Sequence, residues 1–583
     1  MKKFSKVLAA LVISAMMFSV AACGGSDKAS DSTTSAQSST SVSTAAESTT
    51  AGAEKDPETG LPMMADRNDP ITFDVFLRDP GQAPSKDNPV IKKISELTGV
   101  TLNFEFLVGD LAQKIGVMIA GGDYPDAIFA EAPKFVDAGA AIPIEDKILN
   151  YPNLKRHYEP HMDKMKAGFG DGHAYTIEVY GLYEFVPPVY DNGGAGFFLQ
   201  KAVIEDSGYK IPKTPDEYFQ MINDYKAKNP TIDGVKTIGY EILCDGWRDF
   251  CLRNPAMHLL GSGNEGDVIV DQTTFQASLY QTTDVAKAWY KKLNDEYQKG
   301  TIEAETFTQN YDQYIARLSS GAVLGIFDQR WNFGKAEDAL KTAGKYNRTY
   351  TAVPIANPGV KDNFIDPPSK TISGTGGLVI TKNCENPDRL LAFYDYLLNR
   401  EVQDYLAWGV EGKDWVKVGD KGRKLTDERR TLVRDTAKRR DLTGDTLWQY
   451  TPKMQGMYED GVPCDPGSAE DEYLAGQSEY DQKYLQALGV KFPAEILSTP
   501  VERPAYYPVW SFPIEDGSPA KVANTRFIDV CRKYDPQLIL AKPADYDKLW
   551  DKFLKEIEDA NPQPYLDEMN RIIKERMDNA AKK

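Results

Sequence analysis

Few residues of this chain have the types and the spacing that catalysis or metal binding requires. His157 and His161 are four residues apart, but the intervening Tyr-Glu-Pro does not match the H-E-x-x-H zinc motif. Pro160 also disfavours the helix that this motif needs. The sequence contains no C-x-x-C pair, no glycine-rich P-loop and no G-x-S-x-G nucleophile elbow. We therefore expect no catalytic residues and no catalytic metal.

Five of the six cysteines lie in the body of the chain. Cys244 and Cys251 are close enough in sequence to close a small disulfide loop, whereas the other three are scattered. The alternative is that all five are small buried apolar residues, because free cysteine is among the most buried residue types.

Two acidic segments offer clustered oxygen atoms. They are Asp441–Asp445 (DLTGD) and Asp465–Tyr473 (DPGSAEDEY), and neither has the spacing of an EF-hand. We expect solvated acidic loops and no cofactor, with a structural calcium ion at one of them as the alternative.

The N-terminus has the pattern of a secretion signal. Lys2, Lys3 and Lys6 precede an uncharged apolar stretch, Val7–Val20, which is too short to cross a bilayer comfortably. The run Val-Ala-Ala-Cys that ends at Cys23 resembles the bacterial lipobox, in which the cysteine sulfur carries a diacylglycerol and acyl chains such as palmitate anchor the protein. We expect a signal peptide at 1–22 and lipidation at Cys23, with an ordinary signal and a chance cysteine as the alternative.

Residues 23–68 are predicted to form a disordered tether. From Ser26 to Ala53, 21 of 28 residues are Ser, Thr or Ala, and such a segment cannot bury enough apolar surface to offset its ordering entropy. The whole chain carries a net charge of −18, and without the three signal lysines it carries −21. This charge argues against nucleic acid and anionic lipid as partners. We expect the protein on the outer face of the cell membrane, held there by its lipid alone.

Strands and helices alternate at the start of the folded body. Alternating or helical apolar spacing predicts strands at 71–77, 102–106 and 126–130, and helices at 89–98 and 111–119. This order is typical of a parallel sheet with right-handed crossovers.

Charged residues follow the expected strands of that sheet. Ligands of such sheets bind beyond the carboxyl ends of the strands, where Arg78 and Asp79 follow the first strand and Glu131 follows the third. These three residues are candidate ligand contacts, with solvated loop charges as the alternative.

Several segments carry a family resemblance. Asn88-Pro89-Val90, LTGVTLNFEF (97–106) and MIAGGDYPDAIFA (118–130) resemble the N-terminal lobe of extracellular solute-binding proteins, in particular the long sugar-binding lipoproteins of Gram-positive ABC importers. Later segments match in the same order. They include the Pro212, Thr214 and Glu217 pattern, ARLSSGAVLGIFDQRWNFG (316–334) and the loop at 409–412.

The resemblance implies an α/β fold of the type 2 periplasmic-binding class. Two lobes, each with a mixed or parallel sheet flanked by helices, would enclose a cleft. We expect the N-terminal lobe at 70–191 and 355–410, and the C-terminal lobe, with helical additions, at 192–354 and 411–583. The matches run from about residue 70 to 415, and residues 420–560 match less clearly.

The resemblance also implies a function. Members of this family close around a solute by hinge motion and present it to the permease subunits of an ABC transporter, without catalysis. Sugars stack on aromatic rings and need planar polar side chains for their hydroxyls. Residues 316–334 resemble the family's segment that places a tryptophan over the sugar, so the resemblance implies this role for Trp331. The other ligand-binding candidates are tryptophans or their polar neighbours: Trp247, Trp408, Trp510, Arg248 and Asp328.

The leading expectation is a monomeric protein that binds an oligosaccharide. One alternative is the same architecture binding a peptide or another small solute, with Arg78 and Asp79 fixing the chain termini. A less favoured alternative is a surface glycoside hydrolase, which needs two carboxylates about 5–10 Å apart across a cleft. Trp289 and Trp550 lie in helical patterns, and we expect both in the core.

Overall fold

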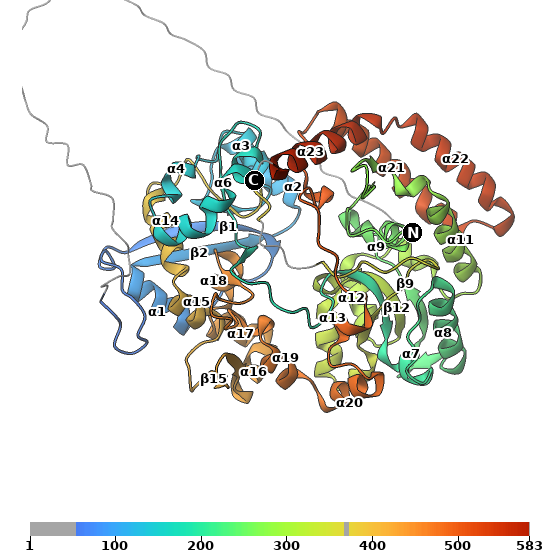
Figure 1. Ribbon diagram of the computed structural model, residues 1–583, viewed down its shortest axis with the longest axis horizontal. Helices are drawn as coiled ribbons and strands as arrows, with labels where there is room; N and C mark the ends of the chain where they lie inside the picture. The colour runs from blue at the N-terminus through green and yellow to red at the C-terminus, as the bar shows by residue number, and fades with distance from the viewer. Residues whose placement is uncertain (1–53, 367–371, 582–583) are drawn as a thin grey trace, which may run out of the picture. The chain divides into compact units, whose positions relative to one another are not determined.

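The computed structural model describes residues 54–366 and 372–581 (Figure 1). The predicted signal peptide, Cys23 and the predicted tether up to residue 53 lie outside these residues. The prediction that the disordered tether extends to residue 68 is wrong, because Leu61 and Met64 are buried in an apolar core. Within the described part, none of the helices combines the length and the apolar character that a membrane span requires.

The first sheet has five strands in the order β2-β1-β3-β14-β4. Strand β1 lies parallel to β2 and to β3, whereas β14 is antiparallel to both of its neighbours. The strands are β1 (Ile71–Pro80), β2 (Val100–Leu107), β3 (Ala127–Phe129), β14 (Leu378–Ile380) and β4 (Thr176–Ile177). The predicted β-α-β-α-β order at the start of the body is confirmed.

The first two helices begin and end where the sequence predicts. The Asn88 side chain accepts the N–H groups of Val90 and Ile91 at the start of α1 (Pro89–Thr98), and Gly99 ends it in the left-handed conformation. Asp110 caps α2 (Leu111–Gly121) in the same way. The other helices around this sheet are α3 (Ala132–Asp137), α4 (Glu145–Ile148), α5 (Pro152–Tyr158), α6 (Met162–Ala167), α14 (Pro387–Leu397) and α15 (Arg400–Ala407).

The second sheet has four strands in the order β13-β6-β12-β9. Strand β6 is antiparallel to β12 and β13, whereas β12 and β9 are parallel. The strands are β6 (Ala195–Gln200), β9 (Ile238–Glu241), β12 (Val323–Gln329) and β13 (Tyr350–Val353). The helices between them are α7 (Lys201–Asp206), α8 (Pro215–Lys228), α9 (Phe250–Arg253), α10 (Pro255–Leu259), α11 (Asp284–Gln298), α12 (Tyr311–Ser319) and α13 (Arg330–Thr342).

Each sheet has its own apolar core, which makes the body two-lobed. Phe73 and Leu77 lie in the first core. Phe197 and Trp289 lie in the second, together with Phe527 and Trp550 of the C-terminal helices. Both tryptophans are buried, as predicted. The C-terminal helices are α21 (Pro519–Leu540), α22 (Tyr546–Asp559) and α23 (Gln563–Ala581), and α21 contacts both α11 and α23 (Figure 1).

Residues 447–464 pack in the first core, although the predicted boundary placed everything after residue 410 in the second lobe. Leu447, Met454 and Cys464 are buried among residues of the first sheet's lobe. Short strand β17 (Met454–Gln455) pairs in parallel with β5 (Leu182–Tyr183). This pairing and the apolar side chains hold the segment there.

A small unit lies between α15 and the C-terminal helices in sequence. It contains an antiparallel hairpin, β15 (Trp415–Val418) with β16 (Gly422–Leu425), around a separate apolar cluster. The helices of this region are α16 (Asp427–Arg434), α17 (Thr436–Leu442), α18 (Asp445–Tyr450), α19 (Glu470–Gly476) and α20 (Glu479–Leu488). Three two-stranded pairs complete the strands of the described residues: β7 (Thr231–Ile232) with β8 (Val235–Lys236), β10 (Ile269–Val270) with β11 (Ala277–Ser278), and β17 with β5.

Candidate functional site

The second sheet brings Trp247 and Trp331 together. Strand β12 ends at Gln329, and Trp331 is the second residue of α13, which follows directly. Trp247 lies in the short turn after β9. Because β9 and β12 are parallel neighbours, their carboxyl ends meet at the same edge of the sheet.

The two indoles form an exposed stacked pair. Their ring centroids are 5.8 Å apart and their planes differ by 13°. Trp247 is 58% exposed and Trp331 is 56% exposed. Phe250 lies against both rings, with centroid distances of 6.0 and 6.1 Å. We call Trp247, Phe250 and Trp331 the aromatic platform.

Arg248 is fixed beside the platform by three contacts. Its guanidinium carbon lies 4.6 Å from the ring centroid of Trp247 and 4.3 Å from that of Tyr311. Its Nε donates to Asn332 Oδ1 at 3.1 Å. The terminal Nη atoms make no hydrogen bond to another residue in the described part of the chain.

Asp328 is a buried residue that is connected to Arg248 through Asn332. It is fully buried, and its carboxylate accepts from the Tyr314 hydroxyl at 2.7 Å and from Asn332 Nδ2 at 3.0 and 3.2 Å. Burial raises the pKa of Asp328 to about 6. The position of Asp328 corrects the expectation that it contacts a ligand, because a fully buried carboxylate holds Asn332, and through it Arg248, instead.

The strand ends of the first sheet carry a second group of candidate residues. The guanidinium carbon of Arg78 lies 5.4 Å from the Phe129 ring centroid, and Asp79 follows at the end of β1. Glu131 forms an ion pair with Lys134 at 2.6 Å. The three predicted residues thus lie at the carboxyl ends of β1 and β3, as expected from the topology.

Sequence reasoning missed the aromatic residues beside them. Tyr180 is 44% exposed, and its ring centroid lies 6.4 Å from that of Phe129. Tyr450 packs against Phe129 at 6.1 Å. Buried Lys453 lies 4.1 Å from the Tyr180 ring centroid, and burial lowers the pKa of this lysine to about 7. No local motif marks these residues, because Tyr180 and Lys453 meet only in the fold.

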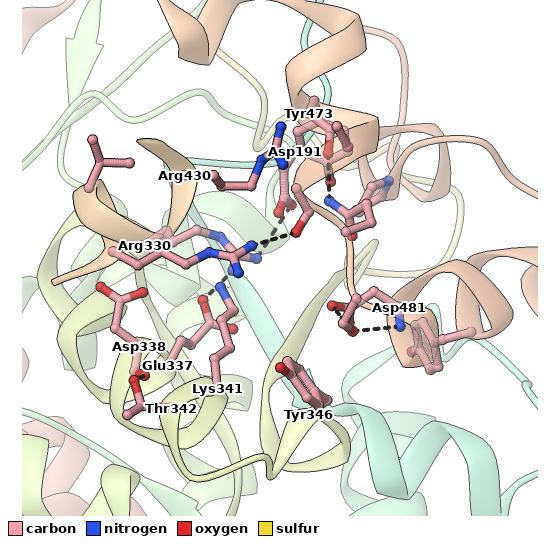
Figure 2. A pocket seen from close by; sticks show the side chains of 18 of the residues that line it. Asp191, Arg330, Glu337, Asp338, Lys341, Thr342, Tyr346, Arg430, Tyr473 and Asp481 are labelled. Atoms are coloured by element: carbon pink, nitrogen blue, oxygen red, sulfur yellow. Dashed lines mark hydrogen bonds and ion pairs between the residues drawn. The ribbon is translucent and has the colours of Figure 1, made fainter. Parts of the chain in front are cut away.

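A charged cavity of about 840 Å³ lies along α13. Figure 2 shows Arg330 at its centre, where Arg330 forms ion pairs with Glu337 and, at 3.3 Å, with Asp191. Its Nε also donates to the Asn192 carbonyl at 3.3 Å. Lys201 and Asp481 are paired at 2.5 Å in the same cavity. Opposite charges therefore neutralise one another here. The cavity could not be predicted from the sequence, because segments far apart in the chain line it.

Residues 90–409 match the sequence profile of the family described as bacterial extracellular solute-binding protein. The chain belongs to this family. The match includes β2, β3, β6, β9, β12 and β14, and therefore strands of both lobes.

Two curated proteins resemble this solute-binding protein over part of their length. The fructooligosaccharide ABC transporter substrate-binding protein FusA of Streptococcus pneumoniae is 25% identical over 349 residues, which are 56% of this chain and 60% of FusA. Lipoprotein LipO of Bacillus subtilis is 22% identical over 355 residues, which are 57% of this chain and 65% of LipO. The aligned part of this chain thus spans less than two thirds of either relative.

A solved structure shows the same fold. The S. pneumoniae FusA EF-hand mutant in complex with fructo-nystose superposes with a TM-score of 0.61 and 18% identity, and the alignment covers 87% of this chain and 100% of that one. The predicted two-lobed α/β fold is confirmed.

Trp408 of this solute-binding protein is a core residue. The side chain is fully buried in the small cluster with Trp415 and Leu425, and its Nε1 donates to the Cys464 carbonyl at 3.0 Å. This position corrects the expectation that Trp408 contacts the ligand, because a buried ring has no surface to offer.

Trp510 is exposed, and among the described residues its ring makes no contact with the rings of the aromatic platform. It is 62% exposed, and the backbone N–H of the preceding Val509 donates to Glu265 at 3.0 Å. Nearby, the Tyr507 hydroxyl donates to Asp366 at 2.7 Å. The role of Trp510 stays a prediction.

The predicted disulfide and calcium alternatives find no support in the described residues. Cys244 and Cys251 are both free thiols, and burial raises the pKa of each. No group of three His, Cys, Asp or Glu side chains in this part of the chain could hold a metal ion. Asp441 is instead paired with Arg440, and Asp465 accepts hydrogen bonds from Ser468.

Proposed function

We propose that this protein captures a carbohydrate, in particular an oligosaccharide, and delivers it to the permease of an ABC importer. The observation that carries the proposal is the exposed, stacked pair of Trp247 and Trp331 at the ligand-binding edge of the second sheet. Two large apolar rings exposed side by side need a partner, since soluble proteins rarely leave such surface uncovered.

Carbohydrate is the ligand class that fits these groups. The apolar faces of a sugar ring stack on indole, while its hydroxyls bind planar polar groups such as the Arg248 guanidinium. The relatives support the same ligand class, since FusA is named for fructooligosaccharide and the solved structure of its EF-hand mutant is a complex with fructo-nystose.

Hinge closure is the proposed mechanism. The first lobe offers Arg78 and Tyr180 at its strand ends, and the second offers the aromatic platform. A ligand that contacts both groups binds the closed form more tightly and shifts the equilibrium towards it. The permease then recognises the closed form, and no step requires a nucleophile or an acid–base pair.

The proposed location is the outer face of the cell membrane. The family is extracellular, and the relative LipO is named a lipoprotein. A lipid on Cys23, after removal of residues 1–22, would anchor the protein, and the Ser/Thr/Ala-rich segment would hold the body away from the membrane.

The test is a thermal-shift and calorimetric screen of the full-length protein, in mild detergent, against oligosaccharides, monosaccharides and short peptides. A ligand that binds only the folded state raises the melting temperature by mass action. We expect one oligosaccharide series to bind without turnover. Trp331→Ala and Trp247→Ala should each weaken binding at least about tenfold, a loss of about 1.4 kcal/mol.

The control is Phe185→Ala, which removes another exposed aromatic ring outside the platform and should leave the affinity unchanged. Binding of peptides alone would replace carbohydrate by peptide as the ligand. Cleavage of a glycan during the screen would contradict the proposal that the protein performs no chemistry.

A further inference from the structure

The cations around the aromatic platform differ in whether they have a carboxylate partner. Arg330, next to Trp331, is paired with Asp191 and Glu337. Arg253 and Arg532 both pair with Asp249, at 2.9 and 2.7 Å. Arg248 is the exception, since it forms no ion pair with any residue in the described part of the chain.

Arg248 belongs to the minority of arginines in the described part of the chain that form no ion pair with a carboxylate. The chain has 86 acidic residues against 68 basic ones, so partners are abundant. The Nε of Arg248 is bound to Asn332, and the guanidinium lies over the rings of Trp247 and Tyr311, so that three contacts hold it beside the platform. The protein holds the terminal Nη atoms in a fixed position without supplying the anion that such a fork fits best.

The acceptors near the platform are largely committed elsewhere. Asp328 is buried and bound to Tyr314 and Asn332. Asp245 accepts the backbone N–H of Tyr311 at 2.9 Å. Gln329 Oε1 accepts from Trp331 Nε1 at 2.7 Å. Each of these three acceptors thus already has a partner within the protein, whereas the Nη atoms of Arg248 have none among the described residues. This difference suits a ligand group that accepts hydrogen bonds.

The first lobe repeats this arrangement on a smaller scale. Arg78 is exposed at the end of β1, lies over the Phe129 ring, and likewise has no ion pair among the described residues. Each group of candidate contacts thus combines aromatic rings with one arginine that lacks a carboxylate partner.

We propose that the ligand is an acidic oligosaccharide whose sugar carboxylate is bound by Arg248. The inference rests on the proposed carbohydrate function and names the substrate class. A uronic acid combines a ring face that stacks on indole with a planar carboxylate that can accept two parallel hydrogen bonds from one guanidinium. The net negative charge of the chain does not prevent this, because charges more than about 8 Å away are largely screened at physiological salt.

The test compares matched acidic and neutral glycans on the full-length protein. The probes are oligomers of galacturonic, glucuronic and mannuronic acid and the same oligomers after chemical reduction of their carboxyl groups, with sulfated oligosaccharides as a further arm. We expect one acidic series to bind at least about tenfold more tightly than its reduced form, and to weaken as the salt concentration rises.

Variants of Arg248 assign the effect to one residue. Arg248→Gln and Arg248→Lys should each lose about tenfold or more in affinity for the acidic oligomer, because neither side chain has the planar fork that fits a carboxylate. The loss for the reduced oligomer should be smaller, since only hydrogen bonds to its hydroxyls are removed. Arg526→Gln is the matched control, since Arg526 is an exposed arginine of the same lobe without an ion pair in the described structure. Unchanged melting temperatures without ligand would show that the variants fold.

The outcomes separate the two proposals. Equal affinity for acidic and reduced oligomers, preference for the sulfated arm, or equal losses in the Arg526 and Arg248 variants would each overturn the carboxylate inference while carbohydrate binding stands. Failure of every acidic and neutral oligosaccharide, with binding of peptides, would overturn both.

Discussion

Two hydrogen bonds in series connect a buried carboxylate to a half-buried guanidinium in the second lobe. Asp328 accepts from Asn332, and Asn332 accepts from Arg248. The position of the Arg248 guanidinium therefore depends on a residue that is buried away from any ligand. We regard Asp328 and Asn332 as positioning residues.

Asp328 should make the stability of the protein depend on pH. Its pKa is raised by burial from 3.8 to about 6. Between these values the folded protein keeps a proton that the unfolded chain releases, so the free energy of unfolding falls as the pH rises. The change is at most about 3 kcal/mol. Urea unfolding at several pH values should show that the free energy of unfolding of Asp328→Asn falls less between pH 4 and 6 than that of the parent protein.

Asp338→Asn, an exposed substitution on the same helix, is the control and should follow the parent protein. If the parent and Asp328→Asn show the same slope between pH 4 and 6, the buried carboxylate does not titrate as described.

Residue types alone identified part of the candidate site. Trp247, Trp331 and Arg248 stand beside polar neighbours in sequence, and the fold brings these three together. Trp408 has a similar sequence neighbourhood but is buried, because Trp415 and Leu425 pack in the same apolar cluster. Tyr180 shows the opposite case, since its partner Lys453 lies far along the chain and no local pattern connects them.

At the scale of elements, helix caps explain why the first lobe was predictable. Asn88 and Asp110 mark the helix starts, while Gly99 and Gly122 mark the ends in left-handed conformation. Capping residues lie directly beside the helix ends that they mark, so they can be recognised from the sequence alone. Sheet order is different, because β14 inserts between β3 and β4 from a distant part of the chain.

Asn88 should contribute more to the free energy of unfolding than an ordinary helix N-cap residue does. Its Oδ1 accepts the N–H groups of Val90 and Ile91, and its Nδ2 donates to the carbonyls of Arg440 and Thr443, each at 2.9 Å. Asn88→Ala breaks all four bonds and should lower the free energy of unfolding by about 2–3 kcal/mol, measured by urea titration.

Two variants separate the contribution of the helix cap from that of the bonds to the carbonyls of residues 440 and 443. Asn88→Asp keeps the cap and removes both donors, so it should lie between the parent and the alanine variant. Asp110→Ala removes a single, exposed cap bond and should cost about 0.5–1 kcal/mol. If Asn88→Ala costs no more than Asp110→Ala, the bonds to residues 440 and 443 contribute nothing to stability.

At the scale of the whole molecule, the chain divides its apolar residues between two large cores. The sequence predicted two lobes but not the assignment of residues 447–464, since the partner of β17 is a two-residue strand with no signal of its own. Among the C-terminal helices, α21 and α22 pack in the second core, whereas the buried residues of α23 lie in a separate apolar cluster.

Separate cores predict separate melting transitions. Phe73→Ala opens a cavity in the first core and Phe527→Ala in the second, each at a cost of about 3–5 kcal/mol. Scanning calorimetry should resolve two transitions without ligand, and each variant should lower one of them while the other stays in place. A single transition that both variants lower equally would mean that the lobes unfold as one unit.

The exposure of the Trp247–Trp331 pair also has an optical consequence. Indoles in contact with water emit at longer wavelengths than buried ones, and most of the other tryptophans, including Trp289, Trp408 and Trp550, are buried. A bound ligand that covers the pair would shift the emission towards the blue and shield both rings from dissolved quenchers. The protein thus carries its own fluorescent reporter of occupancy, and ligand screening requires no attached label.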